Sequence, residues 1–152
     1  MPIEIIPFNT TYAPYFKALN VAWLEKYFVV EPHDEVFLSN CKEYIIDKEG
    51  YIFFAKNNDD IVGTFALMKI ENGVYELGKM AVAEIYRGYG IGQQLLDFCL
   101  QFAERHHWKK ILLYSNTKLE NAIYLYRKYG FEEVALDDNI YARSDIKMEL
   151  TL

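Results

Sequence analysis

Apolar residues recur at steps of three and four along much of the first 50 residues. Over 11–27 this spacing predicts an amphipathic helix, which Pro32 is expected to interrupt. A second helix is expected over 36–46, before Gly50 stops it. A short strand over 3–7 precedes both helices.

The pattern changes after Gly50 to short apolar runs separated by turns. Runs over 51–55, 61–70 and 74–82 are typical of strands. Asn-Asn-Asp-Asp at 57–60 and Glu-Asn-Gly at 71–73 are turn sequences. Strands joined by such short turns form hairpins, so this part of the chain is expected to be antiparallel.

The second half alternates helices and strands. A helix with one apolar face is expected over 91–106, then a strand over 111–114 and a helix over 119–129. Two last strands, over 131–136 and 146–150, are expected to form a second hairpin.

The order β-α-α-β-β-β-α-β-α-β-β predicts an α/β (α+β) fold. Its sheet of about seven strands would be mixed, with helices on both faces. The 152 residues fit one domain, spanning 1–152.

Composition narrows the class of partner. The chain is 52% hydrophobic and 25% charged, which suffices to bury a core and stay soluble. With 16 Lys+Arg against 22 Asp+Glu, its net charge of -6 argues against nucleic-acid binding, which needs a basic surface. The negative charge favours a cationic partner such as an amine, although solubility alone accounts for it.

Other features bear on location and metals. Cys41 and Cys99 form neither a disulfide framework nor a zinc motif. His106 and His107 point apart on a helix, so no metal site is expected. The N-terminus lacks a signal-peptide pattern, and no apolar run is long enough to cross a membrane. We therefore expect a cytoplasmic protein without a membrane partner.

Three glycines lie close together where the expected strand 74–82 passes into the expected helix 91–106. The loop reads Arg87-Gly88-Tyr89-Gly90-Ile91-Gly92. Glycine lacks a Cβ, so the backbone can approach an anion closely, and the first N–H groups of the helix have no partner within it. Arg87 adds a permanent cation, so the loop predicts a pyrophosphate site. A turn that only joins strand to helix is the alternative.

Two other nucleotide-binding loops fit this stretch less well. A dinucleotide-binding loop, Gly-x-Gly-x-x-Gly, would need glycine where Gln93 or Leu95 stands. A P-loop ends in Gly-Lys followed by Ser or Thr, and no such ending follows here.

The loop and a second block resemble the signature of the GNAT superfamily of N-acetyltransferases, which use acetyl-CoA. Arg87, Gly90 and Gly92 fill the family pattern Arg/Gln-x-x-Gly-x-Gly/Ala. The second block, 116–131, matches a helix that ends in Leu-Tyr-x-Lys-x-Gly-Phe. The two blocks cover 74–134, and the order of elements elsewhere agrees with the family.

The resemblance implies a three-layer, mostly antiparallel fold whose splayed strands admit acetyl-CoA as cosubstrate. The pantetheine arm would pair with the backbone of Met80, Ala81 and Val82. Asn116 and Asn121 stand where the family often places polar side chains against CoA, although capping explains them equally well. The pyrophosphate would lie on the backbone of Arg87, Gly88, Tyr89, Gly90, Ile91, Gly92 and Gln93.

The implied reaction is direct attack of a neutral amine on the thioester. Tyr126 takes the position that in this family commonly points at the CoA sulfur, so we expect it to protonate the departing thiolate. A ring that only packs in the core is the alternative for Tyr126. A backbone N–H at Ala81 or Val82 would stabilise the oxyanion.

Glu76 is the candidate base, acting through water. Alternation along the strand would place Glu76, Gly78 and Met80 on one face, with Leu77 and Lys79 on the other. The alternative for Glu76 is a solvent-facing residue paired with a lysine.

The acceptor carries no signature. In the family its pocket lies between the early helices and the last hairpin, here 23–40 and 136–144. Acidic residues there would suit a polyamine, an aminoglycoside or a lysine side chain. The acidic residues of these two segments are Glu25, Glu31, Asp34, Glu35, Asp137 and Asp138. The alternative is that they only form a charged surface in contact with solvent.

We therefore expect an N-acetyltransferase that acts on a primary amine of a small molecule or peptide. The alternatives are a protein N-terminal or lysine acetyltransferase, a non-catalytic acyl-CoA-binding or sensor domain, and an interaction domain without cofactor. Exposed strands near the C-terminus would allow a homodimer by sheet pairing.

Overall fold

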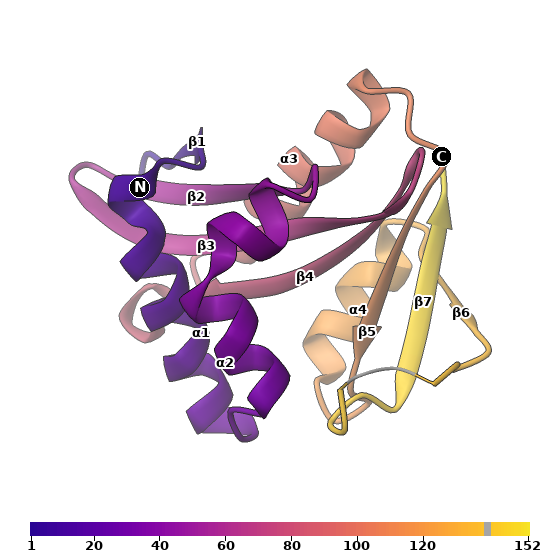
Figure 1. Cartoon of the computed structure of the whole chain (residues 1–152). Helices are drawn as coiled ribbons and strands as arrows, with labels where there is room; N and C mark the ends of the chain where they lie inside the picture. The colour runs from indigo at the N-terminus through magenta and orange to yellow at the C-terminus, as the bar shows by residue number, and fades with distance from the viewer. Residues whose placement is uncertain (139–140) are drawn as a thin grey trace.

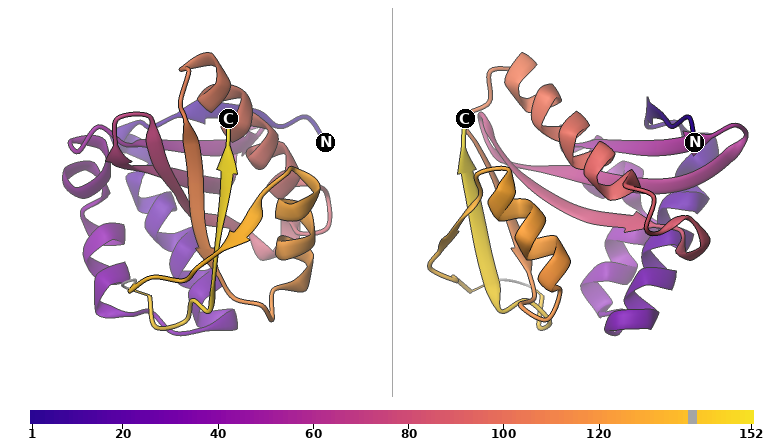
Figure 2. Two further views of the ribbon diagram at one scale, coloured as in Figure 1. Left: turned by 90° about the vertical axis from the view of Figure 1, so that its right-hand side faces the viewer. Right: turned by 180° about the vertical axis from the view of Figure 1, so that it is seen from behind.

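A computed structural model describes residues 1–138 and 141–152. The helices α1 and α2 cover one face of a mixed sheet, and α3 and α4 cover the other (Figure 1, Figure 2). The helices are α1 (Ala13–Tyr27), α2 (Pro32–Ser39), α3 (Ile91–Arg105) and α4 (Glu120–Lys128). The strands are β1 (Glu4–Pro7), β2 (Tyr51–Asn57), β3 (Asp60–Glu71), β4 (Val74–Val82), β5 (Lys110–Ser115), β6 (Glu132–Val134) and β7 (Ile146–Thr151). The predicted fold class and order of elements are confirmed.

The sheet order β1-β2-β3-β4-β5-β7-β6 contains one parallel pair, β4 with β5. Their pairing joins only residues 74–76 to residues 110–112. Beyond these residues the two strands diverge, as the right-hand view of Figure 2 shows from the side of α3 and α4. The splay therefore divides the sheet into a four-stranded and a three-stranded part.

The second helix differs from its prediction. It begins at Pro32 and ends at Ser39, and a separate π-helical turn, η2, covers Lys42–Ile46. The helix α1 has already ended at Tyr27, so Pro32 starts α2 rather than interrupting α1. Its fixed φ suits the first turn of a helix, where its missing N–H is not needed. Glu31 and Asp34 form a capping box at this start, and the backbone N–H of Glu31 donates to Asp34 Oδ2 at 3.0 Å.

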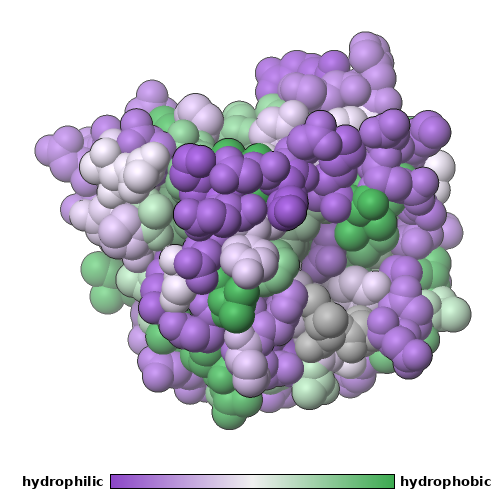
Figure 3. All heavy atoms as spheres, in the orientation of Figure 1, coloured by the Kyte–Doolittle hydropathy of each residue, from purple (hydrophilic) through white to green (hydrophobic). Residues whose placement is uncertain are grey.

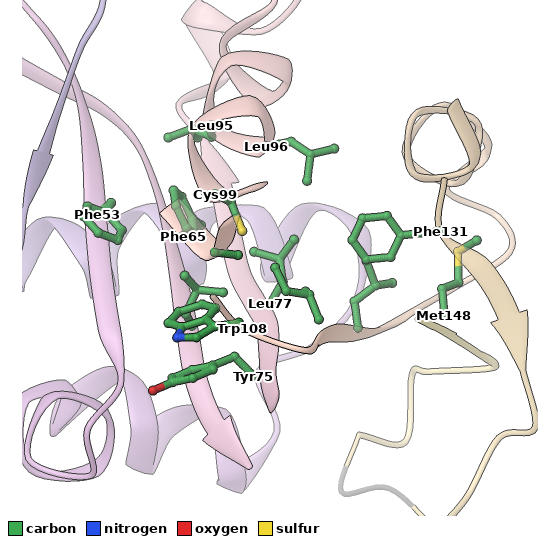
Figure 4. Packing of buried hydrophobic residues seen from close by; sticks show 14 of the residues in the cluster. Phe53, Phe65, Tyr75, Leu77, Leu95, Leu96, Cys99, Trp108, Phe131 and Met148 are labelled. Atoms are coloured by element: carbon green, nitrogen blue, oxygen red, sulfur yellow. The ribbon is translucent and has the colours of Figure 1, made fainter. Parts of the chain in front are cut away.

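The core on the α3 side holds that helix against the sheet. Leu95, Leu96 and Cys99 are fully buried there, and the rings of Tyr75 and Trp108 stack with their centroids 3.7 Å apart (Figure 4). This packing positions the start of α3, and hence the glycine-rich loop, beside the end of β4.

The face of α1 and α2 seen in Figure 3 is mostly hydrophilic, and its hydrophobic side chains appear in separate groups. Within the described residues, no helix has both the length and the apolar character that crossing a bilayer requires.

A β-bulge interrupts β4. Between the pairs that Gly78 and Ala81 make with β3, the single residue Phe65 stands opposite two residues of β4, Lys79 and Met80. Lys79 has φ +55°, a left-handed conformation that few residues other than glycine adopt. The bulge adds one residue and therefore shifts the alternation of side chains.

Because of this bulge, the faces predicted for Lys79 and Met80 are wrong, whereas Glu76 and Leu77 lie on opposite faces as predicted. Lys79 extends to the α2 side, where its Nζ lies 3.3 Å from Asp34 Oδ1, and Glu76 faces the same side. Met80 instead packs with Leu77 in the core on the α3 side. Glu76 and Met80 thus lie on opposite faces of the strand.

Candidate functional site

A groove of about 530 Å³ opens where β4 and β5 diverge. This volume is typical of a ligand pocket. One wall is the end of β4, and the other combines the end of β5 with the start of α4. The glycine-rich loop lies along the groove, and Trp23 and Phe28 of the α1 segment line its other side.

The glycine-rich loop leaves open space in front of its backbone. Gly88 and Gly90 have φ values of +86° and +78°, so both positions favour glycine. A Cβ added to Gly88, Gly90 or Gly92 would meet no atom within 4 Å. The first helical hydrogen bond runs from Gln94 N to Gly90 O at 3.1 Å, so the N–H groups of residues 91–93 precede it. The arrangement is that of an anion site at a helix start.

Arg87 brings a cationic group to the same place. Its Nε donates to Val82 O at 3.0 Å, and the guanidinium lies 5.6 Å from the ring centroid of Tyr27. Its Nη1 is buried and makes no hydrogen bond within the described chain. A buried donor without a partner is costly, and an anionic ligand in the groove would satisfy it.

The strand edge predicted to bind a ligand lines the groove. Ala81 and Val82 pair with β3 on one side only, because pairing with β5 ends at Glu76. Met80, Ala81 and Val82 therefore present backbone groups to the opening. Such an edge can accept an extended ligand as an added strand.

Among the predicted loop residues, Tyr89 differs from the rest. Arg87, Gly88 and Gln93 line the groove, as do Gly90, Ile91 and Gly92, whereas Tyr89 is 62% exposed and is not part of the lining. The side chain of Ile91 is buried in the core, so only its backbone can serve the groove.

Tyr126 lies on α4 and lines the groove from the β5 side. Its ring packs 5.7 Å from that of Phe131, which anchors it to the core. Its hydroxyl makes no hydrogen bond to any described residue. Burial raises the pKa of Tyr126 to about 12, with a smaller contribution from Cys99. The side chain is therefore both a packed ring and a protonated phenol at the groove.

Glu76 is buried, with 9% of its surface exposed, which contradicts a solvent-facing position. The hydroxyl of Tyr141 donates to its Oε2 at 3.2 Å. Burial raises the pKa of Glu76, and the nearby charge of Lys79 opposes this rise. Glu76 does not line the groove itself. It lies behind Gly78, where an added Cβ would stand 3.5 Å from Glu76 Oε2.

The two asparagines have different surroundings. Asn116 Nδ2 donates to Arg143 O at 2.7 Å, and its Oδ1 accepts from Lys118 N at 2.9 Å, so its side chain caps a turn. Asn121 is exposed at the groove and makes no side-chain hydrogen bond within the described chain. Of the two, Asn121 has its amide available to a ligand.

Asp34 is buried at one end of the groove and fully paired. It accepts from Arg143 Nη1 at 2.7 Å and Nη2 at 2.9 Å, from Lys79 Nζ at 3.3 Å and from Glu31 N at 3.0 Å. Burial alone would raise the pKa of Asp34, but these hydrogen bonds and charges hold it below its ordinary value. With four donors on its two oxygens, Asp34 has no acceptor capacity left for a substrate.

Basic residues neutralise most of the other acidic groups predicted at the mouth. Glu31 pairs with Arg143 at 2.9 Å, Glu35 pairs with Lys17 at 3.1 Å, and Asp137 pairs with Lys147 at 2.9 Å. Residues 139–140 of the predicted 136–144 segment lie outside the described residues. The predicted acidic mouth is therefore largely an ion-pair network rather than a free anionic surface.

Sequence reasoning missed three residues of this region: Lys79, Tyr141 and Arg143. Arg143 lies 109 positions after its partner Asp34, and Tyr141 lies 65 positions after Glu76. No local spacing signals such pairs.

Comparison with known proteins identifies the family. Residues 48–133 match the model of the acetyltransferase (GNAT) domain. Streptothricin acetyltransferase A of Bacillus subtilis is 25% identical over 126 residues, which are 83% of this chain and 70% of that protein. One of the first curated relatives that match is a longer protein, and the chain spans only 25% of its length.

Solved structures match almost the whole chain. A GNAT-family acetyltransferase from Staphylococcus aureus Mu50 superposes with a TM-score of 0.87 and 25% identity, covering 99% of both chains. PaiA N-acetyltransferase from Thermoplasma acidophilum, solved in complex with coenzyme A, superposes with a TM-score of 0.78 and 19% identity, covering 100% of both chains.

Proposed function

The chain belongs to the GNAT family of acetyltransferases, and we propose that residues 1–152 form one N-acetyltransferase domain that acetylates a primary amine. The observation that carries the proposal is the buried Nη1 of Arg87, which has no hydrogen-bond partner among the described residues and lies beside the open backbone of the glycine-rich loop. Both features favour an anionic ligand in the groove.

The groove suits acetyl-CoA along its length. Arg87 and the N–H groups of residues 91–93 would hold the pyrophosphate, and Met80, Ala81 and Val82 would pair with the pantetheine amides. Asn121 would add a polar contact, whereas the side chain of Asn116 would keep its structural role. Bound in this way, acetyl-CoA would supply the acetyl group as a thioester.

Residues of the chain would then remove the proton from the attacking amine and donate one to the departing sulfur. Glu76 would accept a proton from the amine through water, because burial raises its pKa toward the working range while Tyr141 holds its carboxylate in place. An N–H of Ala81 or Val82 would stabilise the negative charge on the acetyl oxygen. Tyr126 would donate to the sulfur as the C–S bond breaks and the C–N bond forms.

The raised pKa of Tyr126 refines its proposed role. At a pKa of about 12, the phenol stays protonated across the working range and cannot act as a base. A thiol has a pKa of about 8.5, so complete proton transfer to the free thiolate would be uphill. We therefore expect Tyr126 to act mainly as a hydrogen-bond donor during bond breaking.

The test combines calorimetric titration with CoA and a thiol-release assay with acetyl-CoA and a panel of amines. We expect binding of CoA and release of thiol that depends on the amine. Binding without thiol release from any amine would favour a non-catalytic acyl-CoA sensor, and absence of binding would contradict the proposal altogether.

A further inference from the structure

A second cavity, of about 320 Å³, lies on the α2 side of the sheet. It is lined by residues of α2, the π-helical turn η2, strands β3 and β4 and the segment before β7. Its size is at the lower end of the range for small-ligand sites. Glu76 belongs to this cavity rather than to the groove.

Two buried groups of residues that line the second cavity can accept hydrogen bonds. One is the buried carboxylate of Glu76, which Tyr141 orients. The other is Nε2 of His33, which is buried and makes no hydrogen bond within the described chain. Burial lowers the pKa of His33, so the ring is neutral and one of its tautomers leaves Nε2 as an acceptor. Two such acceptors suit a ligand that donates several N–H groups.

The wall of the second cavity is aromatic. The ring centroids of His33 and Phe37 lie 4.3 Å apart, those of Phe37 and Tyr44 lie 5.4 Å apart, and those of His33 and Tyr141 lie 5.4 Å apart. At the rim, Tyr44 is 44% exposed and Ile70 is 53% exposed. Rings of this kind contact the alkyl or aryl body of a ligand. Lys79 Nζ already lies 5.5 Å from the ring centroid of Phe37 and 4.8 Å from that of Tyr141, so these two rings do not call for a second ammonium group.

Among the described residues that line the second cavity, Glu76 is the only carboxylate, and Lys48 and Lys69 are the other charged groups. Lys69 pairs with Glu49 at 3.0 Å, which reduces but does not reverse the positive charge of the rim. A ligand with a second ammonium group would find no counter-charge there.

Gly78 stands between the second cavity and the groove. It lines the groove, while a Cβ added to it would lie 2.9 Å from Met68 Cε and 3.5 Å from Glu76 Oε2, which both line the cavity. Gly78 therefore adjoins both the groove and two residues that line the second cavity, one of which is the proposed base.

We propose that the second cavity is the acceptor site, and that it takes a primary amine carried on a single apolar or aromatic chain. The amine nitrogen would lie at Glu76 and His33 and meet the thioester at Gly78. This inference rests on the proposed function and excludes the polyamine and aminoglycoside acceptors that the acidic residues suggested.

Matched amines test the chemical class. Hexylamine and phenethylamine should be acetylated with kcat/KM at least about tenfold higher than 1,6-diaminohexane or spermidine, a difference that corresponds to one poorly compensated charge. Equal or better turnover of the polycations would overturn the inference while leaving the proposed function intact. Thiol release from none of these amines would contradict both.

Two variants test the location. Gly78→Ala needs only a small shift of the flexible end of Met68, and it should lower kcat/KM for hexylamine by about tenfold or more with an unchanged Kd for CoA.

Ile70→Glu adds a counter-charge at the rim and should raise the ratio of diaminohexane to hexylamine turnover several-fold. Ile85→Glu, at a residue 82% exposed outside the cavity, is the matched control and should leave this ratio unchanged. An unchanged ratio in Ile70→Glu together with wild-type kinetics in Gly78→Ala would refute the site.

Discussion

Substitution of Gly92 by alanine separates the role of the loop in folding from its role in binding. Gly92 is the second residue of α3, and an added Cβ meets no atom within 4 Å in the free protein. Alanine is favoured over glycine in a helix by up to about 1 kcal/mol. The variant should therefore be as stable as the wild type or have a Tm up to about 2–4 °C higher.

The same methyl group should weaken CoA binding. It would project into the space in front of the N–H groups of residues 91–93, where we place the pyrophosphate. Loss of one hydrogen bond to a charged group costs about 1.5–3 kcal/mol. The Kd for CoA should therefore rise by about 10–100-fold.

Calorimetric titration with CoA and a thermal melt without ligand measure the two effects independently. Gly73→Ala is the crossed control, because Gly73 lies in the β3–β4 turn with φ +79°, where a Cβ would meet Lys109 Cγ at 3.2 Å. That variant should lose about 1–2 kcal/mol of stability and keep its affinity for CoA. A Gly92→Ala protein with wild-type affinity would refute the placement of the pyrophosphate on this loop.

Three further substitutions test the proposed chemistry and the ion-pair network. Tyr126→Phe should lower kcat by about 10²–10⁴-fold with an unchanged Kd for CoA, and an unchanged kcat in steady-state assays would exclude its role as a donor. In the wild type, kcat/KM should fall as the pH drops through the raised pKa of Glu76, because the base must be deprotonated. Glu76→Gln should have a low kcat/KM, and its pH–rate profile should lack this fall at acidic pH. Arg143→Met should lower the free energy of unfolding in urea by about 3–5 kcal/mol, because it leaves the buried carboxylate of Asp34 without its main partner. Pairing holds the pKa of Asp34 below its ordinary value of 3.8 in the wild type. The stability that the paired carboxylate contributes is therefore present above pH 3.8 and is lost as the pH falls through the lowered pKa. Arg143→Met lacks most of this contribution, so its free energy of unfolding should fall less on acidification.

The sequence alone determined the order of elements and the position of the glycine-rich loop, whose residues line the groove. Period-three and period-four apolar spacing in the helices, and turn residues between the strands, are local signals that each segment carries by itself. The glycine-rich loop is equally local, since φ values of +86° at Gly88 and +78° at Gly90 are positions where glycine is favoured. Arg87 could be assigned to the same loop because it is adjacent in the chain.

Only the tertiary structure decided what surrounds the proposed base. The bulge at Lys79 and Met80 reverses the faces predicted for these two residues, and it becomes evident only in the pairing of β4 with β3. The ion pairs of Asp34 and the hydrogen bond of Glu76 join residues 109 and 65 positions apart, so no periodicity could reveal them. The glycine-rich loop could be identified from the sequence because one segment forms it, whereas the proposed acceptor site is assembled from α2, β3, β4 and the segment before β7, which meet only in the fold.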